Sequence, residues 1–166
     1  LKDLKQQYDD YDSLLKMAAE LNELIKQVET CKVSTQKALQ EYQQKSAKYE
    51  QLNEIFILEQ VGIIASDLQE GHACPVCGST NHPRLAPRSN EAVSQQTVTQ
   101  AKKERDVAEE VKAIESDKLA LETQLLESKQ STLYDNGKRV LGETFEYSKD
   151  YIDDIGKKRI QCIEEG

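Results

Sequence analysis

The stretch GHACPVCGSTNHPRLAP, residues 71–87, contains all three prolines of the chain and two of its seven glycines. Proline lacks the amide hydrogen that a helix interior needs, and glycine adopts turn conformations that other residues avoid. On either side of this stretch the sequence is free of proline and rich in Glu, Lys, Gln, Leu and Ala, which is typical of long helices. The stretch therefore predicts a single turn between two helical arms.

Both arms have apolar residues at alternating steps of three and four, the spacing that forms a stripe along one side of a helix. In the first arm the predicted stripe consists of Leu14, Ala18, Leu21, Ile25, Val28, Leu39, Tyr42, Tyr49 and Phe56. It is interrupted by three polar residues, Lys32, Ser46 and Asn53. In the second arm the predicted stripe consists of Val107, Val111, Ile114, Leu121 and Leu125. Stripes of this kind pair with each other in coiled coils.

Because the two arms are similar in length, the sequence predicts an all-α fold, a long antiparallel coiled-coil hairpin in the shape of a rod. We expect an ascending coiled-coil arm at residues 1–68, a zinc-binding turn at residues 69–89 and a descending coiled-coil arm at residues 90–166.

The descending arm is expected to become irregular after about residue 133. Asp135-Asn136-Gly137 is a turn signal, and Gly142 and Gly156 further along weaken a helix. Pairing of the arms would bring two tyrosines of the first arm, Tyr8 and Tyr11, to Tyr147 in an aromatic cluster.

Composition argues against several classes of protein. Only 37% of the residues are hydrophobic, 5% are aromatic and none is tryptophan, so we do not expect a large globular core. The net charge of −8 argues against direct DNA binding, which needs clustered Lys and Arg. No apolar run reaches the roughly 20 residues that cross a bilayer and there is no secretory signal, so we expect a cytoplasmic protein. Because the sequence begins at Leu1 without methionine, we expect a piece of a longer chain.

Two cysteines carry the chemistry of the turn. Cys74 and Cys77 have the C-x-x-C spacing at which two thiolates bind one metal ion, and Gly78 follows at a position suited to positive φ. Soft thiolate donors favour Zn²⁺. A structural zinc site takes four ligands, so the missing ones must come from His72, His82 or a second chain.

Two copies of the same thiolate pair, related by a two-fold axis, satisfy this requirement most simply. We therefore expect Cys74 and Cys77 as the metal ligands, one Zn²⁺ shared in a homodimer, and His82 as a less favoured third ligand. The other cysteines, Cys31 and Cys162, lie alone in helical sequence, and we expect them to be small apolar residues on or beside the seam.

Three alternatives remain at this stage: a turn without metal, a redox-active cysteine pair, and a coiled-coil hairpin that senses metal or redox state within one chain. A thioredoxin-like redox pair would require a βαβ unit, and the sequence shows no strand-rich pattern.

Residues 56–65, FILEQVGIIA, and residues 71–83, GHACPVCGSTNHP, resemble the hook region of the bacterial SbcC family. Members of this family are the large subunits of SbcCD nucleases and belong to the SMC-like DNA repair ATPases. The resemblance implies a zinc hook that joins two coiled coils at their far tips. Residue by residue, it assigns a ligand role to Cys74 and Cys77 alone.

The resemblance also implies a parent protein that binds ATP and Mg²⁺ at distant heads and works with an SbcD-like nuclease. That complex would act on DNA ends and hairpins in double-strand-break repair and recombination. The present sequence has no G-x-x-x-x-G-K-[ST] loop to hold ATP phosphates. We therefore expect this segment to be non-enzymatic, without catalytic or cofactor-binding residues, and to contact neither DNA nor a membrane.

Overall fold

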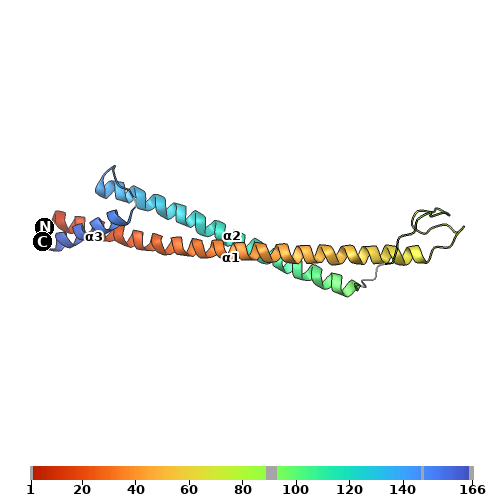
Figure 1. Ribbon diagram of the computed structural model, residues 1–166. Coiled ribbons are helices and arrows are strands. Elements are labelled where there is room, and N and C mark those ends of the chain that lie inside the picture. Colours follow the sequence, from red (N-terminus) through yellow and green to blue (C-terminus); the bar gives the residue numbers. More distant parts are fainter. Residues whose placement is uncertain (1, 89–92, 147, 165–166) are drawn as a thin grey trace. The chain divides into compact units, whose positions relative to one another are not determined.

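The computed structural model describes residues 2–88, 93–146 and 148–164, and within these ranges the regular structure is entirely helical. It consists of α1 (Lys2–Ser66), α2 (Gln95–Leu141) and α3 (Lys149–Glu164) (Figure 1). The long helices α1 and α2 run antiparallel, which confirms the predicted all-α class and its pair of antiparallel arms. No helix in the described ranges combines the length and the apolar character needed to cross a membrane.

The chain divides into two compact units, each of which is described by itself. Residues 1–35 and 115–166 form one unit, which contains α3 and parts of α1 and α2; we call it the three-helix unit. Residues 36–114 form the other, which contains the remaining parts of α1 and α2 and the proline-rich turn; we call it the turn unit.

Large apolar side chains hold the three-helix unit together. Six residues, each at most 2% exposed, form its core: Leu14, Ala18, Leu21, Leu133, Phe145 and Ile155. Full burial of a side chain the size of Leu or Phe contributes about 1.5–3 kcal/mol. At the edge of this core, Asp12 of α1 pairs with Arg159 of α3 at 2.7 Å, and Glu20 of α1 pairs with Lys129 of α2 at 3.3 Å.

The turn unit is packed through small side chains and through the stems of charged ones. The buried residues of its helices, apart from glycine, are Ala38, Ala65, Val98, Ala101 and Ala108. Small residues at a contact let two helices approach closely. Arg105 of α2 lies 4.6 Å from the ring centroid of Tyr49, and Lys112 lies 3.9 Å from that of Tyr42. Cations over aromatic rings therefore take part of the place of a conventional apolar seam.

The predicted stripe of α2 is wrong. Its five members have exposed fractions from 43% to 68%: Val107, Val111, Ile114, Leu121 and Leu125. The helix instead turns neighbouring positions toward α1, among them Ala108, which is 6% exposed, and Lys112, which stacks on Tyr42. Alanines and the aliphatic parts of Lys and Arg side chains fill the contact between the helices. A stripe defined by large apolar residues includes neither kind of side chain.

The predicted stripe of α1 is correct in most positions. Four members are buried, Leu14, Ala18, Leu21 and Val28, and four are partly buried, Leu39, Tyr42, Tyr49 and Phe56. Ile25, however, is 38% exposed, and Leu24 is buried in its place. The seam then continues through Cys31, which is 5% exposed, and not through the exposed Lys32. The expectation that Cys31 serves as a small apolar seam residue is confirmed; Cys162 in α3 is partly buried.

The break in the descending arm lies further along than predicted. Helix α2 continues through Asp135-Asn136-Gly137 and ends at Leu141. Gly137 lies within the helix and faces the ring of Phe145, and a Cβ at this position would overlap that ring. The chain leaves the helix at Gly142, which has φ of +96°, whereas Gly156 lies within α3.

The predicted aromatic cluster of Tyr8, Tyr11 and Tyr147 stays a prediction, and the contacts of its first two members are as follows. Tyr8 lies beside Arg159 of α3, with 6.0 Å between the guanidinium carbon and the ring centroid. Tyr11 packs against the core of the three-helix unit. The third member, Tyr147, lies outside the described residues.

Candidate metal centre

Backbone hydrogen bonds shape the turn between α1 and α2. The amide of Gly71 donates to the carbonyl of Thr80 at 3.2 Å, and the amide of Cys74 donates to the carbonyl of Ser79 at 2.8 Å. Inside this pair the amide of Gly78 donates to the carbonyl of Cys74 at 2.8 Å, and Gly78 has φ of +75°. Glycine tolerates this conformation better than any other residue, and the positive φ expected at Gly78 is confirmed.

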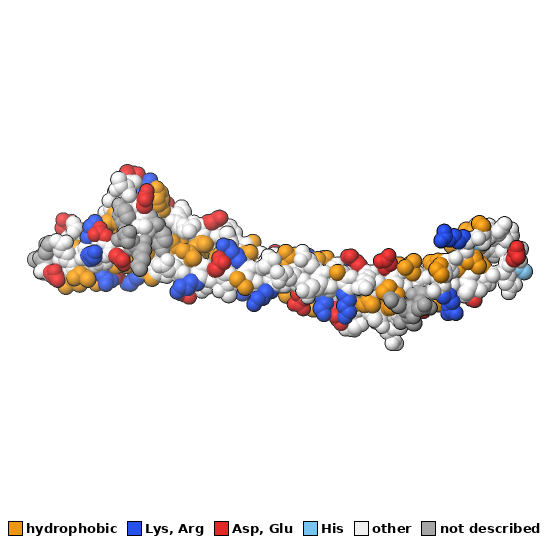
Figure 2. All heavy atoms as spheres, viewed as in Figure 1, with side chains coloured by type: hydrophobic (Ala, Val, Ile, Leu, Met, Phe, Trp, Pro, Cys, Tyr) orange, Lys and Arg blue, Asp and Glu red, His pale blue; other side chains and the backbone are white. Residues whose placement is uncertain are grey.

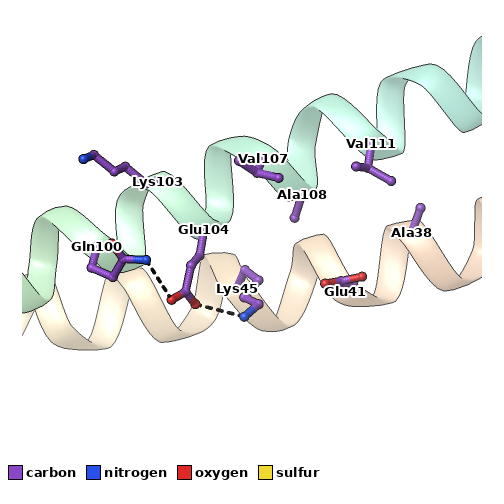
Figure 3. A pocket seen from close by; sticks show the side chains of 9 residues that line it. All are labelled: Ala38, Glu41, Lys45, Gln100, Lys103, Glu104, Val107, Ala108 and Val111. Carbon is purple, nitrogen blue, oxygen red and sulfur yellow. Dashed lines mark hydrogen bonds and ion pairs between the residues drawn. The ribbon is translucent and has the colours of Figure 1, made fainter.

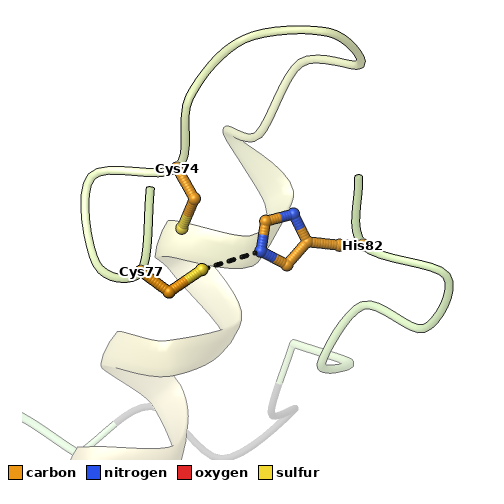
Figure 4. A group of neighbouring side chains, drawn as sticks. All are labelled: Cys74, Cys77 and His82. Atoms are coloured by element: carbon orange, nitrogen blue, oxygen red, sulfur yellow. Dashed lines mark hydrogen bonds between the residues drawn. The ribbon is translucent and has the colours of Figure 1, made fainter. Parts of the chain in front are cut away.

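The tight reversal brings three possible metal ligands together. The two sulfur atoms of Cys74 and Cys77 and a ring nitrogen of His82 all lie within 4.8 Å of one another. The shortest of these approaches joins Nε2 of His82 to Sγ of Cys77 at 3.3 Å (Figure 4). Cys74 is buried, His82 is partly buried and Cys77 is exposed. The point on which they converge is therefore accessible from the side of Cys77.

Amides of the turn favour the thiolate form of Cys74. Hydrogen bonding from the backbone of Cys77, and then from that of Val76, lowers the pKa of the Cys74 thiol. The Val76 amide lies 3.5 Å from the sulfur. Pro75 has no amide hydrogen, so the two amides after it are the ones that face the sulfur. Stabilisation of the thiolate is what metal binding requires.

The donor set fits zinc. Two thiolates and one imidazole are common ligands of Zn²⁺. In a tetrahedral site with metal–ligand bonds of about 2.0–2.3 Å, neighbouring ligand atoms lie about 3.5–3.8 Å apart, within the spread of the cluster. Cys74, Cys77 and His82 thus form a group that could hold a metal ion such as zinc, with one of four positions left open.

The remaining candidates from the sequence lie elsewhere. His72 is not part of the cluster, and Cys31 and Cys162 belong to the three-helix unit. No other trio of His, Cys, Asp or Glu converges in this way in the part of the chain that the structure describes. From the sequence, His82 ranks below the cysteine pair because two copies of that pair complete a structural zinc site more simply. The structure places His82 beside both cysteines, through a fold of the loop that sequence spacing does not reveal.

The cluster lies in an apolar hollow of the turn unit. Besides the three ligands, its lining consists of Val61, Ile64, Ala65, Leu68, Val76, Arg84, Leu85 and Ala86. Several of these side chains also face solvent: Val76 is 74% exposed, Leu85 49% and Val61 45%. Figure 2 shows apolar side chains gathered on the surface around the turn. A group of exposed apolar residues around a functional cluster is typical of a surface that another molecule covers.

Gly62 lets the chain after the turn return to α1. A Cβ at this position would lie 2.8 Å from the carbonyl oxygen of Pro87 and 2.9 Å from Cα of Arg88. Any side chain at Gly62 would therefore push the returning backbone away from α1. The contact anchors the segment that follows His82, a role that no local sequence signal reveals.

A second hollow in the turn unit lies between α1 and α2, where Ala38, Val107 and Val111 contribute apolar walls (Figure 3). Two of its charged groups form an ion pair: Lys45 donates to Glu104 at 2.9 Å. Lys45 lowers the pKa of Glu104, and Glu104 raises the pKa of Lys45. Both groups therefore keep their charges at neutral pH, and the pair acts as a cross-link between the helices.

No family model, no curated protein and no solved structure matches this chain. The resemblance of residues 56–83 to the SbcC hook therefore rests on the motif itself.

Proposed function

We propose that this chain is a zinc-dependent dimerisation module, in which Cys74 and Cys77 of two copies share one Zn²⁺ ion. The proposal is carried by the convergence of two cysteine sulfurs at an accessible point of a tight turn. Cysteines at this spacing form a common zinc motif, and four thiolates complete a tetrahedral structural site. A second copy related by a two-fold axis supplies the missing pair.

The apolar surroundings of the cluster support this pairing. Val76 lies between the two cysteines and is 74% exposed, and Leu85 is 49% exposed in the same hollow. Covering such surface contributes about 25 cal/mol per Å². The turn is small compared with a stable protein interface, which buries upwards of about 1,000 Å², so pairing through it depends on the metal.

We further propose that the module belongs to a longer SbcC-like ATPase that works with an SbcD-like nuclease on DNA ends and hairpins in double-strand-break repair. The support is the resemblance of residues 56–83. The net charge of −8 suits a segment that joins proteins while DNA is bound elsewhere in the parent. The longer protein, purified with its nuclease partner, should cleave hairpin DNA only with ATP and a divalent cation. Cleavage without nucleotide would contradict this part of the proposal.

A second candidate function is a hairpin that binds metal within one chain and senses its availability. The 3.3 Å approach of His82 to Cys77 favours it, because it supplies a third ligand without a partner. Metal stoichiometry separates the two functions, since a shared site holds one zinc per two chains and an intrachain site holds one zinc per chain.

The test is the mass of the chain under native conditions, with zinc and with a chelator. We expect a dimer with one zinc and its dissociation when the metal is removed. The double variant Cys74→Ser, Cys77→Ser should keep its helices by circular dichroism and stay monomeric. Cys162→Ser, which alters a cysteine of α3, serves as the control and should dimerise normally. A monomer that holds one zinc at all concentrations would support the intrachain site and reject the dimer.

A further inference from the structure

Each chain offers three possible metal ligands, one more than it needs to supply to a four-thiolate site shared by two chains. Two copies provide four cysteine sulfurs, which fill the tetrahedral positions of zinc. Each copy also places Nε2 of His82 3.3 Å from Sγ of Cys77. In a shared site of four thiolates both histidines are left out.

We propose that His82 is an exchangeable ligand, which holds zinc in the single chain and gives way to the thiolates of a second copy when two chains pair. This inference rests on the proposed zinc-linked dimer and adds the order of events: metal is loaded first and pairing follows. The single chain then binds zinc through Cys74, Cys77 and His82, with a water molecule in the fourth position.

The position of His82 suits a ligand that leaves. In Figure 4 its ring points toward the two sulfur atoms from the opposite side of the loop. Permanent histidine ligands usually have the second ring nitrogen tied to a carboxylate or carbonyl, which fixes the ring. In the described part of the chain, the contact with Cys77 is the single hydrogen bond of the His82 side chain. The ring can therefore swing away without breaking a second hydrogen bond.

The order of burial also suits the exchange. Cys74 is buried at the base of the cluster, whereas Cys77 is exposed and His82 is partly buried. A second copy that approaches from the exposed side of Cys77 can reach the open position on the metal without displacing the buried Cys74. The cysteine pair of the first chain stays on the metal while His82 and the water molecule are replaced.

The exchange balances as a ligand substitution. The bonds from zinc to Nε2 of His82 and to water break, and two bonds form to Sγ of Cys74 and Sγ of Cys77 in a metal-free second copy. The two thiols of that copy each lose a proton, to solvent or to the released imidazole. When both chains carry zinc, one ion is released to solvent, and pairing then competes with excess metal.

The experiment is a titration with Co²⁺, whose visible absorption reports the number of thiolates bound, at protein concentrations below and above the dimerisation constant. For the unaltered chain we expect two thiolates and one nitrogen in the dilute sample, at one metal per chain. In the concentrated sample we expect four thiolates, at one metal per two chains. Excess Co²⁺ should shift the concentrated sample back toward monomers.

His82→Ala tests the inference, and His72→Ala is its matched control, because His72 lies in the same turn but outside the cluster. In dilute samples, His82→Ala should weaken Co²⁺ binding by at least about tenfold, and free imidazole should restore it. In concentrated samples, the His82→Ala variant should show the four-thiolate spectrum at a lower Co²⁺ concentration than the unaltered chain does. His72→Ala should match the unaltered chain in both.

Three results would overturn the inference. If His82→Ala bound Co²⁺ in dilute samples as tightly as His72→Ala, His82 would not be a ligand of the single chain, although a four-thiolate dimer at high concentration would keep the proposed function. The same conclusion follows if the dilute chain binds no Co²⁺. If the concentrated chain kept two thiolates and one nitrogen at one metal per chain, both the exchange and the zinc-linked dimer would be rejected.

Discussion

In the three-helix unit six apolar residues, Leu, Phe and Ile among them, are at most 2% exposed, whereas in the described part of the turn unit no buried side chain is larger than that of Val98. The first unit can gain several kcal/mol from burial alone. The second has alanines, stacked cations and an exposed apolar hollow around its cysteines. The unit that holds the cluster of Cys74, Cys77 and His82 is therefore the one with the smaller apolar core. A bound metal ion would add most to the stability of the fold in that unit.

The largest loss of stability is expected for Phe145→Ala, which removes a ring from the core of the three-helix unit. Phe145 is 1% exposed at the centre of the core, and loss of such a ring costs about 3–5 kcal/mol. Hydrogen exchange should show faster opening of α3, while zinc uptake at the turn stays unchanged. Leu125→Ala is the control: Leu125 is 46% exposed on α2 and its loss should change stability by less than about 0.5 kcal/mol. A large loss of stability in Leu125→Ala would show that Leu125 packs in the seam predicted from the sequence.

Gly62→Val should have the next largest effect, this time in the turn unit. Its side chain would collide with the backbone of Pro87 and Arg88, and overpacking of this kind costs about 1–3 kcal/mol. We expect weaker metal binding and altered amide signals of the turn in NMR spectra, with the three-helix unit unaffected. Metal affinity equal to that of the unaltered chain would show that the contact at Gly62 does not position the cluster.

Gly78→Val should weaken metal binding without any collision, because a Cβ at Gly78 meets nothing within 4 Å. The cost comes from the φ of +75°, about 1–2 kcal/mol for a residue with a Cβ. This corresponds to about a tenfold loss of zinc affinity in a competition titration. Gly156→Ala, a glycine within α3 that also has open space around it, should leave zinc affinity unchanged. Equal affinity of both variants would show that Gly78 is incidental.

The smallest effect is expected at Asp12, on the edge of the three-helix unit. A hydrogen bond from Lys16, and then one from Arg159, lowers the pKa of the Asp12 carboxyl. Because this pKa is lowered in the folded chain, the contribution of the carboxylate is complete above its usual range. It is lost as the pH falls through the lowered value. Asp12→Asn should therefore lower the urea midpoint slightly at neutral pH and not at strongly acidic pH. An equal difference in urea midpoint at neutral and at strongly acidic pH would exclude a role for the charge of Asp12.

Most of the candidate site and much of the fold could be predicted from local signals. The proline-rich turn, the two arms and the pair Cys74 and Cys77 follow from residue types and spacings that act on the nearby backbone. Two predictions drawn from local signals are wrong. Asp135-Asn136-Gly137 is typical of a turn, yet it lies within α2, where Gly137 leaves room for the ring of Phe145. The stripe of α2 was placed on its large apolar residues, which the structure leaves exposed.

The sequence by itself determined the helical class, the position of the single proline-rich turn and the chemistry of its cysteines, because proline, glycine and helical periodicity act over a few neighbouring residues. Only the tertiary structure decided which face of α2 meets α1, because Lys112 and Arg105 reach their places by stacking on tyrosines of another helix. It also decided that His82 joins the cysteines, since that approach depends on how the loop folds back rather than on any residue preference.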